Sequence, residues 1–368
     1  MSLPRQLRAL RAHAVVRSFA RAADVLTAVR KLRFVQLDPI RAPARAADLI
    51  LRHRVASYRA GDLDRQYPGL PLAEDYLHVY GVMTAEARAL LHPRSKPHSL
   101  YIEREHPRLP KQVLAHVTKH GDTHPRELAA ALGRLQVMSG WGGVSTATTR
   151  ALEALHYRGK LDVVRREQGI KVYAPARPLA ELQPPRQRAE ALMLLLLDLY
   201  APLPESSLRQ LIRMITQSSL STNLRERTWK SLRAGAQIKP MEIDGVTWLM
   251  PAAEVLRDDV PDSVRLLAPF DPVVWDRRRF AAFWGWEYRL EAYTPPARRQ
   301  FGYYALPLLW RDDVIGWANA RIDNDRLHVA PQYVAAAPRS AQFRNALAAE
   351  CEQLRICVGA GALQIEAV

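Results

Sequence analysis

Residues 33–40 read Arg-Phe-Val-Gln-Leu-Asp-Pro-Ile, a short strand pattern closed by a proline. Successive side chains of a strand point to opposite faces, so Gln36 and Asp38 share one face with their Cα atoms about 6.6 Å apart. An amide and a carboxylate at that spacing can hold one water molecule, which the amide orients and the carboxylate deprotonates. The pattern therefore predicts a catalytic pair. The competing interpretation is a solvated strand face on which Asp38 only shapes a turn before Pro39.

The overall charge indicates the kind of partner. The 368 residues include 53 Lys and Arg against 37 Asp and Glu, a formal net charge of +16. This field attracts phosphate backbones, and the basic residues are spread along the chain instead of gathered in one tail. A broad footprint along a duplex is therefore favoured over a membrane surface or an acidic protein. The longest apolar run, residues 191–197, is too short for a membrane helix.

The cysteines and the N-terminal residues give information on the cellular compartment of the protein. Cys351 and Cys357 fit neither a disulfide framework nor a zinc motif, which suits a reducing cytoplasm. The first 23 residues are rich in Arg and lack acids, as transit peptides do. We favour a DNA-facing first helix of the fold instead, because the strand at 33–40 follows with no cleavable spacer.

The N-terminal region predicts a first winged-helix module over residues 1–100. Residues 4–12 and 19–32 carry apolar faces at helical spacing, and the strand that holds Gln36 and Asp38 follows them. Four arginines flank this pair and are predicted to reach phosphates: Arg33, Arg41, Arg45 and Arg52. The alternative is an Arg-rich face that is only solvated.

The same order of elements recurs over residues 101–176. Helices are predicted at 109–120, from Pro125 and over 145–159, and a hairpin at 161–173. Three helices and a hairpin make a winged helix-turn-helix, whose third helix would dock on DNA through Thr149 and Arg150. His116 and His120 have the helical spacing of zinc ligands, but the helix is broken before His124, so no metal site is expected.

A third repetition spans residues 189–250. Helices are predicted at 189–200, 206–215 and 224–234, and Asp244-Gly245 joins two strands in a strong hairpin signal. The repeat is one of architecture, not of sequence. Three such units in tandem suggest a clamp around a duplex.

The composition changes over residues 263–368, which hold five of the eight Trp between 275 and 317. Strands are predicted at 288–293, 303–310 and 314–322, and a packing helix at about 339–355. Aromatic side chains alternate with arginines that could stack bases or hold phosphates: Arg277, Arg279, Arg298 and Arg299. The alternative is a β-rich core with an Arg rim.

Five runs together resemble a known family. They read QLDP at 36–39, LLAPFDP at 266–272, WDRRR at 275–279, YRLEAYTP at 288–295 and RQFGYYALP at 299–307. These runs resemble the YcaQ/AlkZ-like family of winged-helix DNA glycosylases, in its Gln-x-Asp form, across nearly the whole chain. The resemblance implies an α+β fold of three tandem winged helices followed by a β-rich C-terminal part.

The resemblance also implies a reaction. The family removes alkylated bases from double-stranded DNA, including purines alkylated at a ring nitrogen, and unhooks some interstrand crosslinks. A cationic base is already a good leaving group, so Asp38 would stabilise an oxocarbenium-like sugar and activate water that Gln36 orients. No lysine nucleophile is implied. We therefore expect a monofunctional, monomeric hydrolase without metal or cofactor, acting in the cytoplasm at the nucleoid.

Two stretches depart from the family pattern and concern the substrate range. Many members carry a His within Arg-x-His-Asp-Leu, where residues 45–49 here read Arg-Ala-Ala-Asp-Leu. Residues 74–78 match the family's Trp- and His-bearing stretch only loosely.

The rival interpretation is a non-catalytic winged-helix DNA-binding protein such as a transcriptional regulator. Binding alone should tolerate Asp38→Asn, whereas catalysis should not.

Overall fold

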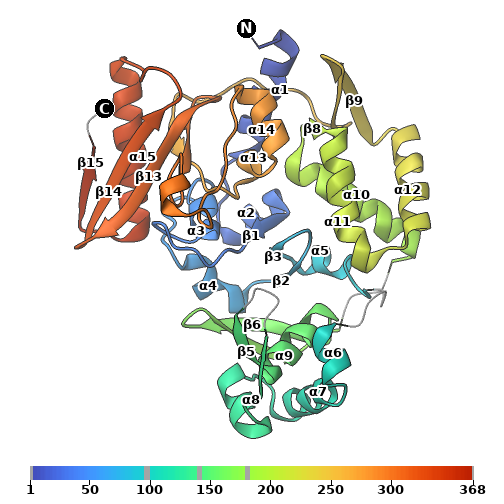
Figure 1. Ribbon diagram of the computed structural model, residues 1–368. Helices are drawn as coiled ribbons and strands as arrows, with labels where there is room; N and C mark the ends of the chain where they lie inside the picture. Colours follow the sequence, from blue (N-terminus) through green and yellow to red (C-terminus); the bar gives the residue numbers. More distant parts are fainter. Residues whose placement is uncertain (1–2, 95–99, 139–142, 179–182, 367–368) are drawn as a thin grey trace. The chain divides into compact units, whose positions relative to one another are not determined.

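The computed structural model describes residues 3–94, 100–138, 143–178 and 183–366, and only the backbone of residues 216–219. The described chain has a mixed α+β fold with fifteen α-helices and several sheets (Figure 1). It forms two compact units. Unit 1 comprises residues 1–63, 195–210 and 235–368, and unit 2 comprises residues 64–194 and 211–234. Three boundaries fall inside helices, namely α4 (Asp62–Gln66), α10 (Pro185–Tyr200) and α11 (Glu205–Ser219).

The N-terminal part of unit 1 is mainly helical. Its elements are α1 (Arg5–Ser18), α2 (Val25–Leu32), β1 (Phe34–Gln36) and α3 (Ala46–Leu51). Asp24 begins α2 by accepting a hydrogen bond of 2.7 Å from the Thr27 amide. Arg33 ends the helix with a φ of 65°, and Phe34 and Val35 then enter the core. Both predicted helices and the predicted strand are therefore present, with shifted ends.

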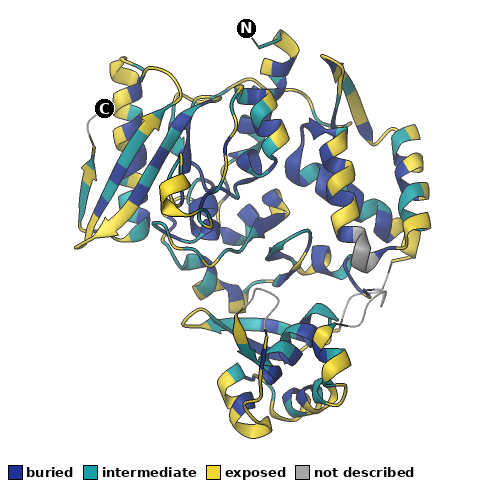
Figure 2. Ribbon diagram, viewed as in Figure 1, coloured by how far each residue is buried: buried dark blue, intermediate teal, exposed yellow. Residues whose placement is uncertain are grey.

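The C-terminal part of unit 1 is a five-stranded sheet with a long helix packed on it. Its elements are β11 (Val264–Leu266), α13 (Pro272–Trp275), α14 (Arg277–Trp284), the 3-10 turn η2 (Pro296–Arg298), β12 (Leu306–Trp310), β13 (Asp313–Asp323), β14 (Arg326–Tyr333), α15 (Ala341–Val358) and β15 (Ala362–Ile365). The strands follow the order β11-β12-β13-β14-β15, with only β14 and β15 parallel. Buried and more exposed residues alternate along β13 (Figure 2). The strands predicted at 303–310 and 314–322 and the helix predicted at 339–355 are confirmed.

The strand predicted at 288–293 is wrong, because this segment is an irregular loop. Its side chains are held or exposed one by one. The Tyr288 hydroxyl donates to the Ala305 carbonyl at 2.6 Å, and Glu291 is buried beneath the loop, whereas Tyr293 points to solvent. The alternation of apolar and polar residues in this segment therefore does not translate into alternating burial.

The two ends of the chain share one core in unit 1. Val15 of α1 and Phe19, which directly follows the helix, pack with Leu267, Val274 and Phe280 of the C-terminal part. A second cluster joins the other end of α1 to the hairpin of β9 (Ile238–Ile243) and β10 (Val246–Pro251). This hairpin turns at Asp244 and Gly245 with φ values of 50° and 72°, as its sequence predicts. The short strand β8 (Leu203–Pro204) completes its sheet.

Unit 2 contains its own helical core. Its remaining elements are η1 (Tyr67–Gly69), β2 (Leu72–Tyr76), β3 (Tyr80–Thr84), α5 (Ala85–Ala89), α6 (Tyr101–Glu105), α7 (Leu109–His120), α8 (Pro125–Leu132), β4 (Gln136–Met138), β5 (Val144–Thr146), α9 (Ala147–Tyr157), β6 (Leu161–Glu167), β7 (Ile170–Pro175) and α12 (Thr222–Ala234). The helices predicted from residues 109, 125 and 145 appear as α7, α8 and α9, and β6 pairs with β7 as the predicted hairpin. No helix in the described part of the chain has both the length and the apolar character needed to cross a membrane.

Candidate active site

The predicted pair Gln36 and Asp38 lies where β1 ends. Gln36 is the last residue of the strand, and its Oε1 atom is buried without a hydrogen-bond partner among the described residues. Asp38 is half-buried, and its Oδ1 accepts a hydrogen bond of 2.9 Å from the Ile40 amide. Asp38 therefore does shape the turn at Pro39, but with only one of its two carboxylate oxygens. A buried oxygen without a hydrogen-bond partner is energetically unfavourable. The Gln36 oxygen is therefore suited to accept a hydrogen bond from water or from a substrate.

The electrostatic surroundings of Asp38 suit a cationic substrate. Burial raises the pKa of the Asp38 carboxyl above its ordinary value of 3.8, and the Ile40 amide offsets part of this rise. No Lys or Arg side chain in the described structure contributes to the Asp38 pKa or forms an ion pair with this carboxylate. A carboxylate without a countercharge can stabilise positive charge that develops on a sugar, and its raised pKa makes it a better proton acceptor.

Tyr304 is a further buried polar residue of unit 1, which the interpretation of the sequence did not single out. Its side chain is 2% exposed, its ring meets Phe270 edge-on, and its hydroxyl has no hydrogen-bond partner among the described residues. Burial raises the pKa of Tyr304, and the negative charge of Asp38 raises it further, so the two groups are within electrostatic reach. The only sequence signal was the run at 299–307, where Tyr304 was treated as one of many core aromatics.

The loop that precedes Tyr304 is held by buried polar contacts. Glu291 Oε2 accepts hydrogen bonds from the backbone amides of Gln300, Phe301 and Gly302 at 2.8, 2.7 and 3.3 Å. Asn319 on β13 donates from Nδ2 to the Phe301 carbonyl at 2.8 Å. Gly302 has a φ of 115°, and a Cβ atom there would clash with the Asn319 amide, so only glycine fits. These contacts fix the backbone two residues before Tyr304.

The basic residues predicted to contact DNA in unit 1 differ in their exposure and in the contacts that their side chains make. Arg41 and Arg298 are exposed, and neither side chain forms an ion pair with another residue that the structure describes. Arg33 pairs with Asp198, and Arg45 pairs with Asp48 at 3.3 Å. Arg299 donates to the Thr294 carbonyl at 2.8 Å and lies over the Tyr303 ring.

Three other predicted contacts are used inside unit 1. Arg52 donates to Glu350 at 2.5 Å and to the Leu266 carbonyl at 3.0 Å, and its side chain is 3% exposed. Arg279 is fully buried against the carbonyls of Tyr200 and Pro272. Arg277 donates to the carbonyls of Val274 and Pro269 and stacks on Tyr288. Contacts inside unit 1 hold these guanidinium groups, so we leave them out of the proposed DNA contacts. Arg278, between Arg277 and Arg279 in sequence, is exposed.

Thr149 and Arg150 lie in the first turn of α9 in unit 2. The Thr149 amide and hydroxyl both bond to Thr146, whose side chain caps the helix. Arg150 pairs with Glu153 at 2.5 Å but stays partly exposed. Of the two, Arg150 is the one that could still reach a phosphate.

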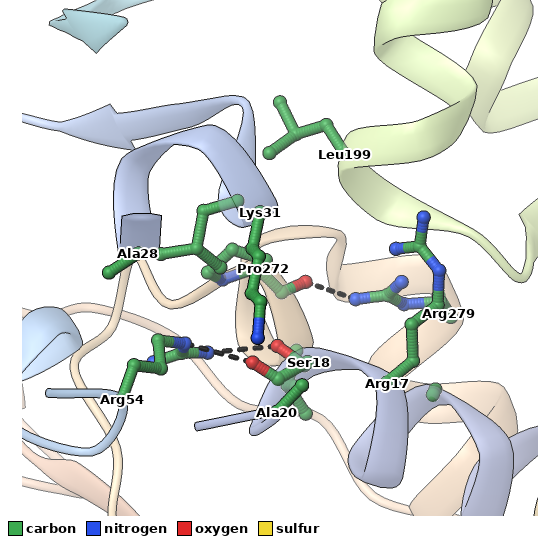
Figure 3. Close-up of a pocket in the computed structure, with 12 residues that line it drawn as sticks. Arg17, Ser18, Ala20, Ala28, Lys31, Arg54, Leu199, Pro272 and Arg279 are labelled. Atoms are coloured by element: carbon green, nitrogen blue, oxygen red, sulfur yellow. Dashed lines mark hydrogen bonds between the residues drawn. The ribbon is translucent and has the colours of Figure 1, made fainter. Parts of the chain in front are cut away.

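A small cavity in unit 1 is lined by cationic side chains but is too small to hold a base (Figure 3). Its volume is about 30 Å³, room for a water molecule but not for a nucleobase. Arg54 at its edge forms a bidentate ion pair with Asp271 and donates to Ser18. Arg17 pairs with Glu254 and Asp198. Arg54 and Arg17 are therefore neutralised by ion pairs inside unit 1.

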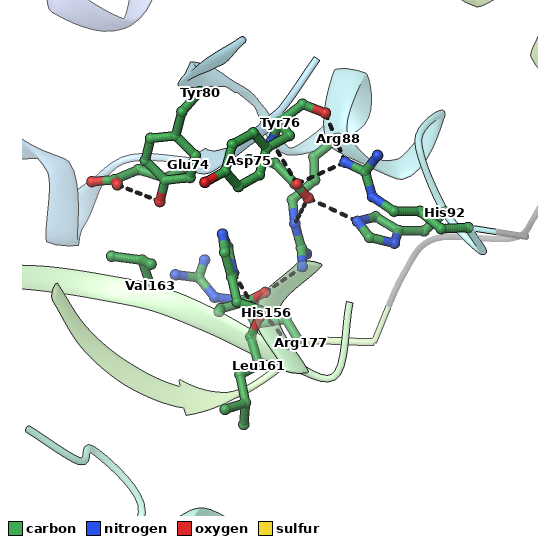
Figure 4. Close-up of polar contacts among 12 residues, drawn as sticks. Glu74, Asp75, Tyr76, Tyr80, Arg88, His92, His156, Leu161, Val163 and Arg177 are labelled. Atoms are coloured by element: carbon green, nitrogen blue, oxygen red, sulfur yellow. Dashed lines mark hydrogen bonds and ion pairs between the residues drawn. The ribbon is translucent and has the colours of Figure 1, made fainter. Parts of the chain in front are cut away.

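The loosely matching stretch at 74–78 forms a buried ion-pair cluster in unit 2 (Figure 4). Asp75 accepts from Arg94 at 2.8 Å and lies 2.8 Å from His92 Nε2. Burial alone would raise the pKa of Asp75, but His92 and Arg94 outweigh burial and hold the pKa below its usual range. Burial also lowers the pKa of His78 to about 3, which keeps it neutral. Asp75 is thus neutralised within the protein, whereas Asp38 is not.

The other departure lies at the start of α3. Ala46 and Ala47 are both fully buried there, so this position presents no polar group to a substrate.

Two comparisons with known proteins concern the family and the fold of this chain. A family model described as DNA glycosylase AlkZ-like matches residues 29–355. The solved structure of the Streptomyces sahachiroi DNA glycosylase AlkZ superposes with a TM-score of 0.65 at 16% sequence identity, covering 98% of this chain and 99% of that one. At this identity the structural match shows a shared fold.

Proposed function

The chain belongs to the AlkZ-like DNA glycosylase family, and we propose that it hydrolyses the N-glycosidic bond of cationic, alkylated purines in double-stranded DNA. The observation that carries the proposal is the contrast between its carboxylates. Asp38 is half-buried without a countercharge beside an unsatisfied Gln36 oxygen, whereas Asp75 in unit 2 is paired with arginine. Such a site favours a substrate that brings its own positive charge.

In the proposed reaction the alkylated base leaves with the electron pair of its bond to C1′. Because the base is cationic before cleavage, it departs neutral and needs little help from an acid. Asp38 stabilises the positive charge that develops on the sugar and takes one proton from the attacking water. Gln36 Oε1 accepts the other water hydrogen and orients the lone pair toward C1′. The proposal includes no lysine adduct, and strand cleavage is therefore not part of it.

The remaining expectations belong to this proposal. Three tandem winged helices over residues 1–100, 101–176 and 189–250 would clamp the duplex, with residues 263–368 as the β-rich part. The helix order α7-α8-α9 before β6 and β7, and α10-α11-α12 before β9 and β10, supports two of them. The proposed phosphate contacts are Arg33, Arg41, Arg45, Arg150, Arg298 and Arg299. We propose a monomer that acts on the chromosome in the cytoplasm and also unhooks interstrand crosslinks.

The test is single-turnover base release with the purified chain in excess over a duplex that carries one N7-methylguanine. Abasic sites are revealed by alkaline strand cleavage, and an untreated sample reports any lyase activity. Asp38→Asn should lower the rate by roughly 10²- to 10⁴-fold, and Gln36→Ala by a smaller factor, with DNA affinity unchanged or tighter. Asp323→Asn removes an exposed carboxylate on β13 and serves as the matched control.

A second duplex that carries an interstrand crosslink between two guanine N7 atoms extends the test. Unhooking would release two separable strands on a denaturing gel. Wild-type release with an Asp38→Asn rate equal to wild type would refute the assignment of Asp38. Salt-dependent DNA binding without release from either substrate would favour a non-catalytic DNA-binding protein.

A further inference from the structure

Residues 285–305, which join α14 to β12 in unit 1, form a long loop whose backbone is held at several points. The buried carboxylate of Glu291 accepts hydrogen bonds from three successive amides, those of residues 300–302, at 2.8, 2.7 and 3.3 Å. Across the loop, Arg299 Nε donates to the Thr294 carbonyl at 2.8 Å. A loop fixed in this way can present a side chain to a ligand without a large ordering cost on binding.

Tyr303 is the aromatic side chain that this loop presents to solvent. It is 45% exposed, and Arg299 lies over its ring with the guanidinium carbon 5.2 Å from the ring centroid. The neighbouring aromatic residues turn inward, since Phe301 packs against the core of unit 1 and Tyr304 is 2% exposed. Exposing a large ring to water is unfavourable, and tyrosines in such positions are enriched at binding surfaces.

The surroundings of Tyr303 are positively charged. Residues 292–304 contain two arginines, Arg298 and Arg299, and no Asp or Glu. Glu291, which directly precedes them, is 6% exposed and bonded to backbone amides. The charged side chains of this segment therefore complement a phosphate backbone. An aromatic ring beside cations is the arrangement with which proteins stack bases that are free of base pairing.

We propose that Tyr303 is a stacking platform for an unpaired base in DNA, with Arg298 and Arg299 on the phosphates that flank this base. The faces of a paired base are covered by its neighbours in the duplex, so a tyrosine ring on a loop can cover only a base that has left the stack. Stacking requires no particular hydrogen-bonding edge, so the platform accepts any of the four bases. The inference uses DNA as the partner, which the family establishes, and does not use the proposed reaction.

The test measures equilibrium binding of the full chain by fluorescence anisotropy, with two undamaged duplexes of one sequence. One duplex is fully paired, and the other carries a single unpaired adenine at its centre. Wild type should bind the second duplex more tightly. Tyr303→Ala should lose affinity for it by roughly 5- to 150-fold, while its affinity for the paired duplex stays within twofold of wild type.

Two variants control this measurement. Tyr303→Phe keeps the ring and should keep the preference for the unpaired base. Tyr101→Ala makes the same truncation at a tyrosine of α6 that is 47% exposed, and it should also keep the preference. Wild type with equal affinity for both duplexes, or Tyr303→Ala with the wild-type preference, would overturn the inference. An equal loss for both duplexes would overturn it too, because it would indicate a contact with the backbone and not stacking.

The binding test is independent of base release, because neither duplex carries a lesion. Suppose that Tyr303→Ala loses the preference and that the wild-type chain releases no N7-methylguanine. That result would support the platform while counting against the proposed reaction.

A second readout observes the ring of Tyr303 directly. The tyrosines are replaced by 3-fluorotyrosine, and the fluorine resonance of Tyr303 is identified by its loss in Tyr303→Phe. A base stacked on the ring shifts this resonance through its ring current, so the duplex with the unpaired adenine should shift it more than the paired duplex does. Equal shifts with the two duplexes would overturn the inference.

Discussion

The ion pair of Arg54 with Asp271 connects the segment that carries Gln36 and Asp38 to the C-terminal part of unit 1. Arg54 Nη1 lies 2.7 Å from Asp271 Oδ2, and Arg54 Nη2 lies 3.0 Å from Asp271 Oδ1. The side chains are 1% and 0% exposed. We expect Asp271→Asn to destabilise the protein strongly, because it leaves the Arg54 charge buried without its counterion.

The size of the expected destabilisation follows from the burial of the Arg54–Asp271 ion pair. Removing one partner of a buried ion pair costs about 3–5 kcal/mol. Asn keeps the shape of Asp and one acceptor, and it can still cap α13 through the Val273 amide, so we expect the lower end, about 3 kcal/mol. For a unit of this size, that loss corresponds to a decrease in Tm of roughly 6–12 °C.

The assay is chemical denaturation followed by tryptophan fluorescence. Most Trp residues of the chain lie in unit 1, so the signal reports on the unit that holds the ion pair. The matched control is Glu287→Gln, which breaks an Arg–carboxylate pair of 2.9 Å with Arg289 whose two side chains are each 73% exposed. The control should lose less than about 0.5 kcal/mol. A loss below about 1 kcal/mol for Asp271→Asn would refute the reasoning from burial.

Four further predictions concern Asp38, Gly302 and the exposed arginines. The base-release rate should fall as the pH drops through the Asp38 pKa, with the midpoint above 3.8, and Asp38→Asn should abolish this limb of the profile. The same raised pKa means that ionised Asp38 opposes folding at neutral pH, so Asp38→Asn should stabilise the fold there and lose this advantage below pH 3.8, as denaturation midpoints would show. Gly302→Ala should cost about 1–3 kcal/mol and slow base release, whereas Gly285→Ala, with a φ of 72° but open space, should cost only about 1 kcal/mol; equal losses would contradict the clash. Arg41→Ala and Arg298→Ala should each reduce the slope of log affinity against log salt by about 1 in a DNA titration, and an unchanged slope would remove that residue from the interface.

Local signals in the chain were read correctly where neighbours in sequence decide the outcome. The start of α8 at Pro125 and the turn at Asp244-Gly245 depend on backbone preferences over a few residues. The short strand that ends at Gln36, before Pro39, was also predicted, although Asp38 lies two residues beyond its end. These features need no knowledge of the rest of the fold.

Arg277 and Arg279 show where such reasoning fails. Both were expected at a DNA-facing surface because they stand beside aromatic residues in a basic run. The structure uses them instead to satisfy backbone carbonyls within unit 1. A basic pattern specifies charge, but the direction of each side chain depends on which distant carbonyls and rings lie beneath the helix.

The sequence by itself determined the helices, the hairpins, the positive charge and the Gln-x-Asp pair, because hydrogen bonding and side-chain periodicity act over a few neighbouring residues. Only the tertiary structure decided that Asp38 lacks a countercharge and that Asp75 has one. Burial and electrostatic partners are set by the packing of segments that are distant in sequence, such as α1 against the C-terminal part of unit 1, and no local pattern encodes that packing.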